Sequence, residues 1–344
     1  MRRAWALRVP PGLRLVRNYE RPWLKSDLAA GAALSAFLIP AGMAYAEAAG
    51  LPAVTGLYAS IIPLLAYAVF GPSRVLIIGP DSSLAPMIAA AVLPLAGRDP
   101  DHAVALAGVL ALLIGGLLLV GRIFKLGFVT SLLSKPIRVG YLNGIALAIM
   151  LSQLPKLLGI PAPAGSLIDT ATGTAQAVAG GAVNPVALLF GAGTIAVIVA
   201  CRFLPWKLPG VLIAVVAATA LTAALDLTTA LPTVGALPRG LPVPALGGVS
   251  LEDVLALLGP AAGIALIAFA DTSVLSKSLA ARSGVQVNGN QEMGALGVAN
   301  VASGLFSGFP ISGSTSRTPI ALEAGAKSPL GGVVAAILVE LFMV

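Results

Sequence analysis

Two stretches of the chain interrupt long apolar segments with glycine, proline and small hydroxyl residues. One extends from Gly71 to Pro86, and the other extends from Ser307 to Pro319. Proline lacks a backbone N–H and is tolerated in a helix only in the first turn, so each of these prolines places a helix start within about four residues upstream. The sequence therefore predicts two short helices, each capped by Ser or Thr and each preceded by backbone that cannot be regular helix, with an extended entry at Gly71–Pro80.

Both interruptions lie in a chain that is too apolar for a soluble protein. Of its 344 residues, 58% are hydrophobic and 10% are charged, whereas a soluble domain carries roughly 25% charged residues. At about 20 residues per span, the apolar segments suffice for about eleven transmembrane helices. We therefore expect an all-α polytopic protein in the lipid bilayer of the cell inner (plasma) membrane.

The position of the two short helices predicts an anion site. Irregular backbone at membrane depth is tolerated only where it is buried in protein or lines a wet cavity, and helix N-termini attract anions. Seven expected spans precede the long polar segment 227–250, so the short helix of span three is matched by that of span ten with inverted topology. This arrangement is typical of inverted-repeat transporters. A chance similarity between two bends is the alternative interpretation.

The distribution of basic residues predicts a cytoplasmic N-terminus, because most Lys and Arg fall on one side of the alternating spans. We divide the chain into a cytoplasmic basic leader (1–27), a first inverted repeat of spans one to seven (28–226), an extracellular linker (227–250) and an incomplete second repeat of spans eight to eleven (251–344). The sequence stops inside an apolar segment, so we expect it to be truncated.

Three local expectations follow from composition. Segment 159–181, rich in Gly, Ala, Pro and Thr, is expected to form an outer loop. Segment 251–258 is expected to form an interfacial turn ahead of a separate span eight at 261–281. Span one, at 28–46, is expected to be interrupted at Ile39–Gly42, where Pro40 lies near its middle.

Three groups of residues resemble the SulP sulfate-permease family of anion transporters. They are Phe37–Ala46 with Gly50–Pro52 and Gly56–Tyr58, then Gly71–Arg74 with Gly79–Pro80, and last a spaced set from Asn290 to Lys327 that includes Gly308–Pro310 and Ser316–Arg317. The resemblance implies fourteen spans in two inverted repeats of seven, as in uracil permeases, with a core of spans one to four and eight to eleven that moves against a gate. It also implies spans twelve to fourteen and a cytosolic STAS domain, which this sequence does not contain.

The resemblance places the anion pocket between the starts of spans three and ten, with Arg317 just behind Ser316 and an aromatic side chain from span one. The substrate-binding residues that we predict are Tyr45, Ser82, Ser83, Ser314, Thr315, Ser316 and Arg317. Two residues depart from the family pattern. Ala41 stands where the family often has Gln, and Asp81 places a carboxylate where it would oppose an anion.

Charged residues at membrane depth have functional and structural interpretations. An unpaired charge there costs roughly 2.5 to 3.5 kcal/mol on insertion scales, so Arg317 either attracts an anion or pairs with Asp81 or Glu323. Asp271, near the middle of span eight, either carries a coupling proton or cation or forms a core hydrogen bond. Glu292, close to a helix start, is interpreted as a complement to the helix dipole.

These patterns predict a secondary active transporter of anions of the sulfate, bicarbonate or dicarboxylate class, working by alternating access. Coupling to a proton or sodium ion, or exchange, is expected. A nucleobase permease of the uracil type on the same fold is the alternative, and it would need carboxylates from spans eight and ten. We do not expect an enzyme, a cofactor or a metal site, because the chain has one histidine and one cysteine. We do not expect a nucleic-acid partner, because the basic residues follow the alternation of the membrane spans. A homodimer stays open.

Overall fold

The computed structural model describes residues 10–17, 19–97, 99–131, 135–161, 167–203, 210–227, 230–231, 240, 244, 247–283, 288–314 and 316–344. The chain forms two compact units. The first contains residues 1–138 and 238–344, and the second contains residues 139–237. The first unit holds the segments that the family resemblance assigns to the core.

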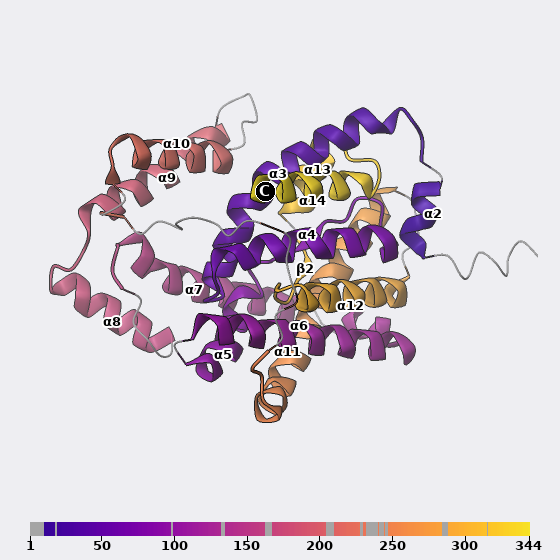
Figure 1. The fold of residues 1–344 in the computed structure, drawn as a ribbon, viewed down its shortest axis with the longest axis horizontal. Coiled ribbons are helices and arrows are strands. Elements are labelled where there is room, and N and C mark those ends of the chain that lie inside the picture. The colour runs from indigo at the N-terminus through magenta and orange to yellow at the C-terminus, as the bar shows by residue number, and fades with distance from the viewer. Residues whose placement is uncertain are drawn as a thin grey trace, which may run out of the picture. The chain divides into compact units, whose positions relative to one another are not determined.

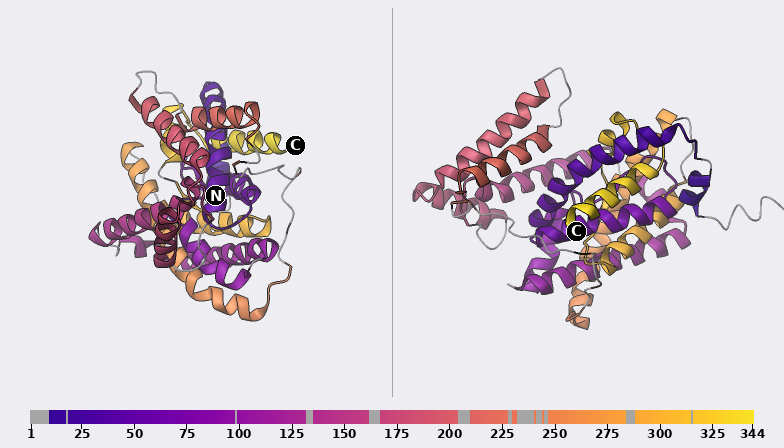
Figure 2. Two further views of the ribbon diagram at one scale, coloured as in Figure 1. Left: turned by 90° about the vertical axis from the view of Figure 1, so that its left-hand side faces the viewer. Right: turned by 45° about the horizontal axis from the view of Figure 1, so that its top comes forward.

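The first unit is a helical assembly around two short strands (Figure 1). Its elements are α2 (Pro11–Arg17), α3 (Trp23–Ala48), α4 (Ala53–Phe70), β1 (Ile78–Gly79), α5 (Ala85–Ala96), α6 (Pro100–Ile123), the 3-10 helix η1 (Leu126–Ser131), α11 (Leu251–Ser283), α12 (Gly289–Leu305), β2 (Ser312–Gly313), α13 (Arg317–Glu323) and α14 (Leu330–Met343). Helix α14 lies along α3 and α4, and α12 packs between α4 and α6 (Figure 2). Helices from the two ends of the sequence therefore share one core.

Small residues let these helices approach closely. A Cβ atom added at Gly56 of α4 would lie 1.9 Å from the Gly42 carbonyl oxygen of α3, and one added at Gly304 of α12 would lie 2.4 Å from the Gly108 carbonyl oxygen of α6. Such contacts are typical of packing in membranes, where helices associate through close van der Waals contact. Among the described helices, α3, α4, α6 and residues 251–281 of α11 are long and apolar enough to cross a membrane.

The two irregular stretches meet as a pair of antiparallel strands. Ile78 of β1 is opposite Gly313 of β2, and Gly79 is opposite Ser312. The Ser314 N–H extends the pairing by donating to the Ile77 carbonyl oxygen at 3.0 Å. The pairing satisfies backbone groups that would otherwise be costly to bury. The sequence predicted extended backbone in the first stretch but not that it pairs with the second.

The second unit consists of most of α7 (Lys135–Leu157) with α8 (Leu167–Ala179), α9 (Pro185–Phe203) and α10 (Gly210–Ala224). The expectation of an outer loop at 159–181 is wrong, because α8 occupies more than half of it. The prolines of this segment end at Pro163, and the alanine-rich sequence after them favours a helix.

Two expectations about helix interruptions are also wrong. Helix α11 is continuous from Leu251 to Ser283 and passes through Pro260, so no separate turn precedes span eight. Helix α3 likewise continues through Pro40. Proline is tolerated inside a membrane helix when neighbouring groups satisfy the freed carbonyl. Helix α3 begins at Trp23, before the expected start of span one at Leu28.

Candidate functional site

The start of α5 is shaped by an aspartate turn. The Asp81 carbonyl oxygen accepts hydrogen bonds from Leu84 N and Ala85 N, both at 3.2 Å. Its side-chain Oδ1 accepts from Ser83 N at 3.0 Å and from Ser83 Oγ at 2.9 Å. Aspartate favours such turns because its carboxylate can replace a backbone acceptor. Pro86 lies in the first turn of α5 as predicted, but Leu84 and not a serine is the N-cap.

The start of α13 is fixed by hydroxyl groups. Thr272 Oγ1 of α11 accepts a hydrogen bond from Gly313 N at 2.8 Å, and Thr318 Oγ1 accepts one from Ile77 N at 3.1 Å. Ser316 is the N-cap, and Ser314 Oγ accepts from Arg317 N at 3.3 Å. These bonds attach the beginning of α13 both to α11 and to the segment before α5.

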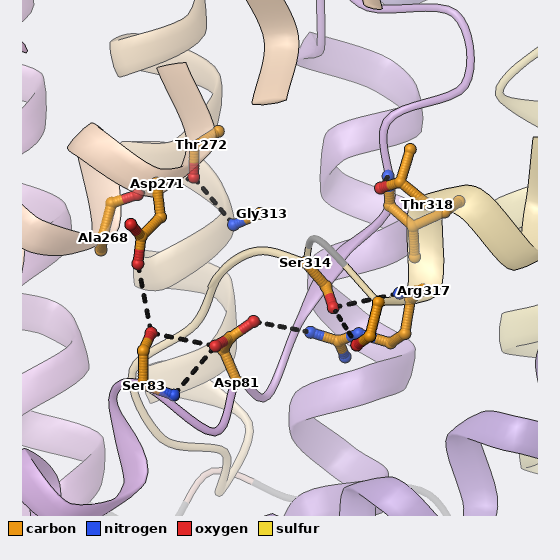
Figure 3. A network of polar contacts seen from close by, with 11 residues as sticks. Asp81, Ser83, Ala268, Asp271, Thr272, Gly313, Ser314, Arg317 and Thr318 are labelled. Carbon is orange, nitrogen blue, oxygen red and sulfur yellow. Dashed lines mark hydrogen bonds and ion pairs between the residues drawn. The ribbon is translucent and has the colours of Figure 1, made fainter. Parts of the chain in front are cut away.

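Arg317 places a buried positive charge between the two helix starts. The residue is 0% exposed, and its Nη2 lies 4.0 Å from Asp81 Oδ2 (Figure 3). Its Nε and Nη2 have no hydrogen-bond partner among the described residues. Gly79 makes room for the guanidinium, because a Cβ atom at that position would lie 2.6 Å from Nη1. A guanidinium carries five N–H donors, so this one retains hydrogen-bonding capacity for a further acceptor.

A second carboxylate reaches the same place from α11. Asp271 Oδ2 accepts a hydrogen bond from Ser83 Oγ at 3.2 Å, so that one serine lies between the carboxylates of Asp271 and Asp81. Figure 3 shows this row ending at the Arg317 guanidinium. The site thus combines one buried cation with two carboxylates.

The structure brings together the predicted site residues that it describes. Tyr45 of α3 interacts with the Ser82 and Ser316 side chains and with the charges of Asp81 and Arg317. Ser314 Oγ lies 3.0 Å from Ser316 Oγ. Thr315 lies outside the described residues. Of the two pairing partners considered for Arg317, Asp81 is the one that the structure shows.

Glu292 is a buried acidic residue whose role the sequence did not reveal. It is 0% exposed, and its Oε1 accepts a hydrogen bond from the Tyr67 hydroxyl of α4. Its Oε2 accepts from Ser276 Oγ at 2.9 Å and from Ser73 Oγ at 3.3 Å. Glu292 does lie in the first turn of α12, where an acid complements the helix dipole, and the side chain of Asn288 caps the helix. No local sequence pattern around Glu292 predicts these hydroxyl donors, because they belong to other segments of the chain.

The described residues contain no group of three or more His, Cys, Asp or Glu that could hold a metal ion. The carboxylates of Asp81 and Asp271 form a pair with serine, and Glu292 has three neutral hydroxyl donors. These carboxylates and hydroxyls can form ion pairs and hydrogen bonds, and a carboxylate can bind a proton.

Known proteins are similar to this chain in sequence. The probable sulfate transporter MT1781 of Mycobacterium tuberculosis (strain CDC 1551 / Oshkosh) is 42% identical over 336 residues, which cover 97% of this chain and 60% of that protein. Solute carrier family 26 member 6 of Homo sapiens is 32% identical over 370 residues, covering 99% of this chain and 48% of that protein. The chain thus spans about half to three fifths of the length of these relatives.

Two solved structures have the same fold. The transmembrane domain of the cyanobacterium bicarbonate transporter BicA matches with a TM-score of 0.86 at 26% identity, over 94% of this chain and 83% of that chain. The structure of SLC26A9 matches with a TM-score of 0.92 at 24% identity, over 99% of this chain and 57% of that chain. These matches confirm the inverted-repeat fold of seven plus seven spans as the architecture to which the chain corresponds.

The family of the chain is shown by a match that covers nearly its whole length. The description of the sulfate permease family fits residues 24–344, which include every element that builds the Arg317 site. The resemblance found in the three groups of residues is therefore confirmed, and this multi-pass membrane chain belongs to the sulfate permease family.

Proposed function

We propose that the chain is the anion-binding part of a secondary transporter for oxyanions of the sulfate, bicarbonate or dicarboxylate class. The buried Arg317 guanidinium, with Nε and Nη2 lacking partners among the described residues, is the observation that carries this proposal. Burying a charge of this kind costs free energy unless a group of opposite charge offsets it. Relatives named as sulfate and bicarbonate transporters support an oxyanion as that partner.

We propose that the anion lies at the Ser314–Arg317 stretch, where Ser316 is exposed and Arg317 is buried behind it. Ser316 Oγ and backbone N–H groups would touch the anion, and Arg317 would supply the positive potential. A helix N-terminus contributes about 0.3 to 1 kcal/mol at exposed sites and up to roughly 2 kcal/mol when partly buried. Binding built from such contributions is weak, which suits a protein that must release its substrate.

Coupling and movement complete the proposal. Asp271 would carry the coupling proton or sodium ion, since its carboxylate is joined to the site through Ser83. Alternating access would come from movement of the first unit, which carries the whole site, relative to the second. The N-terminus would lie in the cytoplasm and the protein in the cell inner (plasma) membrane. The nucleobase alternative finds no support in the relatives named above.

Substitutions of Arg317 in the full-length protein test the anion site. Lysine keeps the charge but loses the planar fork, so Arg317→Lys should retain most of the sulfate binding measured by calorimetry, whereas Arg317→Ala should weaken it severalfold. Equal collapse in both variants would mean that the guanidinium grips the anion directly.

A panel of ligands separates the candidate substrates. Sulfate, bicarbonate, a dicarboxylate and uracil are titrated into the wild type and the Arg317→Ala variant. We expect at least one oxyanion to bind in a manner that depends on Arg317. Saturable binding of uracil alone, or oxyanion binding that survives Arg317→Ala unchanged, would contradict the proposed function.

A further inference from the structure

Asp81 faces the Arg317 guanidinium from the segment before α5. Its Oδ2 faces Arg317 Nη2 at 4.0 Å, and Figure 3 shows the carboxylate between the Ser83 hydroxyl and the guanidinium. This distance is too long for a hydrogen bond. Asp81 therefore offsets the charge of Arg317 but does not satisfy its Nε and Nη2 donors.

An ionised Asp81 opposes any anion that approaches Arg317, because like charges repel strongly where water is scarce. Three charged or titratable groups face Asp81 from the surrounding elements: Arg317 on α13, Asp271 on α11 through Ser83, and Tyr45 on α3. With both aspartates ionised, negative charge exceeds positive charge before an anion arrives. Uptake of one proton removes that excess.

Ser83 can accept a hydrogen bond from Asp81 once Asp81 has taken up this proton. Its Oγ lies 2.9 Å from Asp81 Oδ1 and 3.2 Å from Asp271 Oδ2. A hydroxyl has one hydrogen to donate and lone pairs to accept with. When Ser83 donates to Asp271, its oxygen can accept a hydrogen bond from protonated Asp81. The same geometry therefore accommodates both the ionised and the neutral form of Asp81.

We propose that Asp81 is a built-in competitor of the transported anion, and that an anion binds beside Arg317 together with a proton that Asp81 takes up. The inference rests on the proposed anion site at Arg317. One anion and one proton enter from solution, and the anion replaces the Asp81 carboxylate as the negative charge that offsets Arg317. Neutral Asp81 then donates its hydrogen bond to Ser83.

Calorimetric titration with sulfate tests this competition in the full-length protein without any ion gradient. Sulfate keeps its charge between about pH 5 and about pH 8, and wild-type affinity should fall as pH rises, by up to about tenfold per pH unit, the limit for one proton taken up on binding. Asparagine resembles a neutral carboxyl group, so Asp81→Asn should keep the low-pH affinity at high pH. Asp101→Asn, which removes an exposed carboxylate of α6, should behave like the wild type.

Several outcomes would overturn the competitor role. The Asp81→Asn variant could lose affinity with pH as steeply as the wild type, or it could bind more weakly at every pH with an unchanged melting temperature. Should that variant fail to fold, Asp81→Glu retains a titrating carboxylate and Ser83→Ala removes the acceptor of its proton. We expect Asp81→Glu to keep the pH slope and Ser83→Ala to weaken binding at low pH, and the opposite results would contradict the inference.

The same titrations separate this inference from the proposed function. Wild-type protein that binds no sulfate at any pH, or an Arg317→Ala variant that binds it as well as the wild type, would reject the anion site itself. Sulfate binding that requires Arg317 but ignores Asp81 would reject only the competition.

Discussion

At the scale of single residues, the site depends on side chains whose partners come from distant parts of the sequence. Asp81, Ser83, Asp271 and Arg317 form one row of charges and hydroxyls, although they belong to three separate segments. Sequence reasoning identified all four as notable, because charge is rare at membrane depth and small hydroxyl residues cluster before Pro86. It could not show that one serine would lie between two carboxylates.

Asp271 allows a test of coupling at this scale. Asp271→Asn keeps the size of the side chain and its ability to accept from Ser83, but it cannot ionise. Tracer uptake into proteoliposomes with imposed proton or sodium gradients should then lose the gradient dependence that Asp271 contributes, while anion exchange and the proton dependence that comes from Asp81 stay measurable. Unchanged dependence on both gradients would leave Asp271 with a structural hydrogen bond only. The loss of sulfate binding at high pH, measured without gradients, should persist because Asp81 remains.

At the scale of elements, hydropathy and proline placement predicted most of the helices. Pro86 and Pro319 placed the short helices correctly, because proline restricts where a helix can begin. The pairing of β1 with β2 could not be predicted from the sequence, since nothing local specifies a partner strand more than two hundred residues away. The break expected before Pro260 was wrong, because α11 continues through this proline.

Close contact between α3 and α4 gives a prediction about elements. In Gly56→Ala, the new methyl group would meet the Gly42 carbonyl oxygen, so the two helices must separate. Overpacking of this kind costs about 1 to 3 kcal/mol, and we expect a clearly lower melting temperature in detergent. Gly116→Ala on α6 is the matched control, because a Cβ atom there meets nothing within 4 Å. Equal stability of the two variants would contradict the close packing.

At the scale of the whole molecule, a buried carboxylate joins an early and a late segment of the chain. Asp27 of α3 is 0% exposed, and its Oδ1 accepts hydrogen bonds from Lys327 N at 2.7 Å and Ser328 N at 3.2 Å. Its Oδ2 accepts from Ser328 Oγ at 2.7 Å. The segment between α13 and α14 is thereby attached to the first long helix.

Removal of this attachment should destabilise the protein. Asp27→Ala leaves buried donors without an acceptor, and an unsatisfied buried group costs about 1 to 3 kcal/mol. We expect the melting temperature to fall strongly in Asp27→Ala and less in Asp27→Asn, which keeps one acceptor oxygen. Asp101→Ala, at an exposed position of α6, is the control. A fall in Asp27→Ala no larger than in this control would show that the attachment is unimportant for stability.

The backbone pairing of β1 with β2 has a consequence for the direction of transport. Because hydrogen bonds join the two strands, we expect the helix starts that follow them to keep their mutual position in the movement that we propose for the first unit. Under the proposed function, the anion would then meet the same set of contacts whether the site opens inward or outward. A carrier with equal affinity on its two sides has no preferred direction of its own. Net flux would reverse whenever the gradients of the anion and of its coupling ion are both exchanged between the two sides of the membrane.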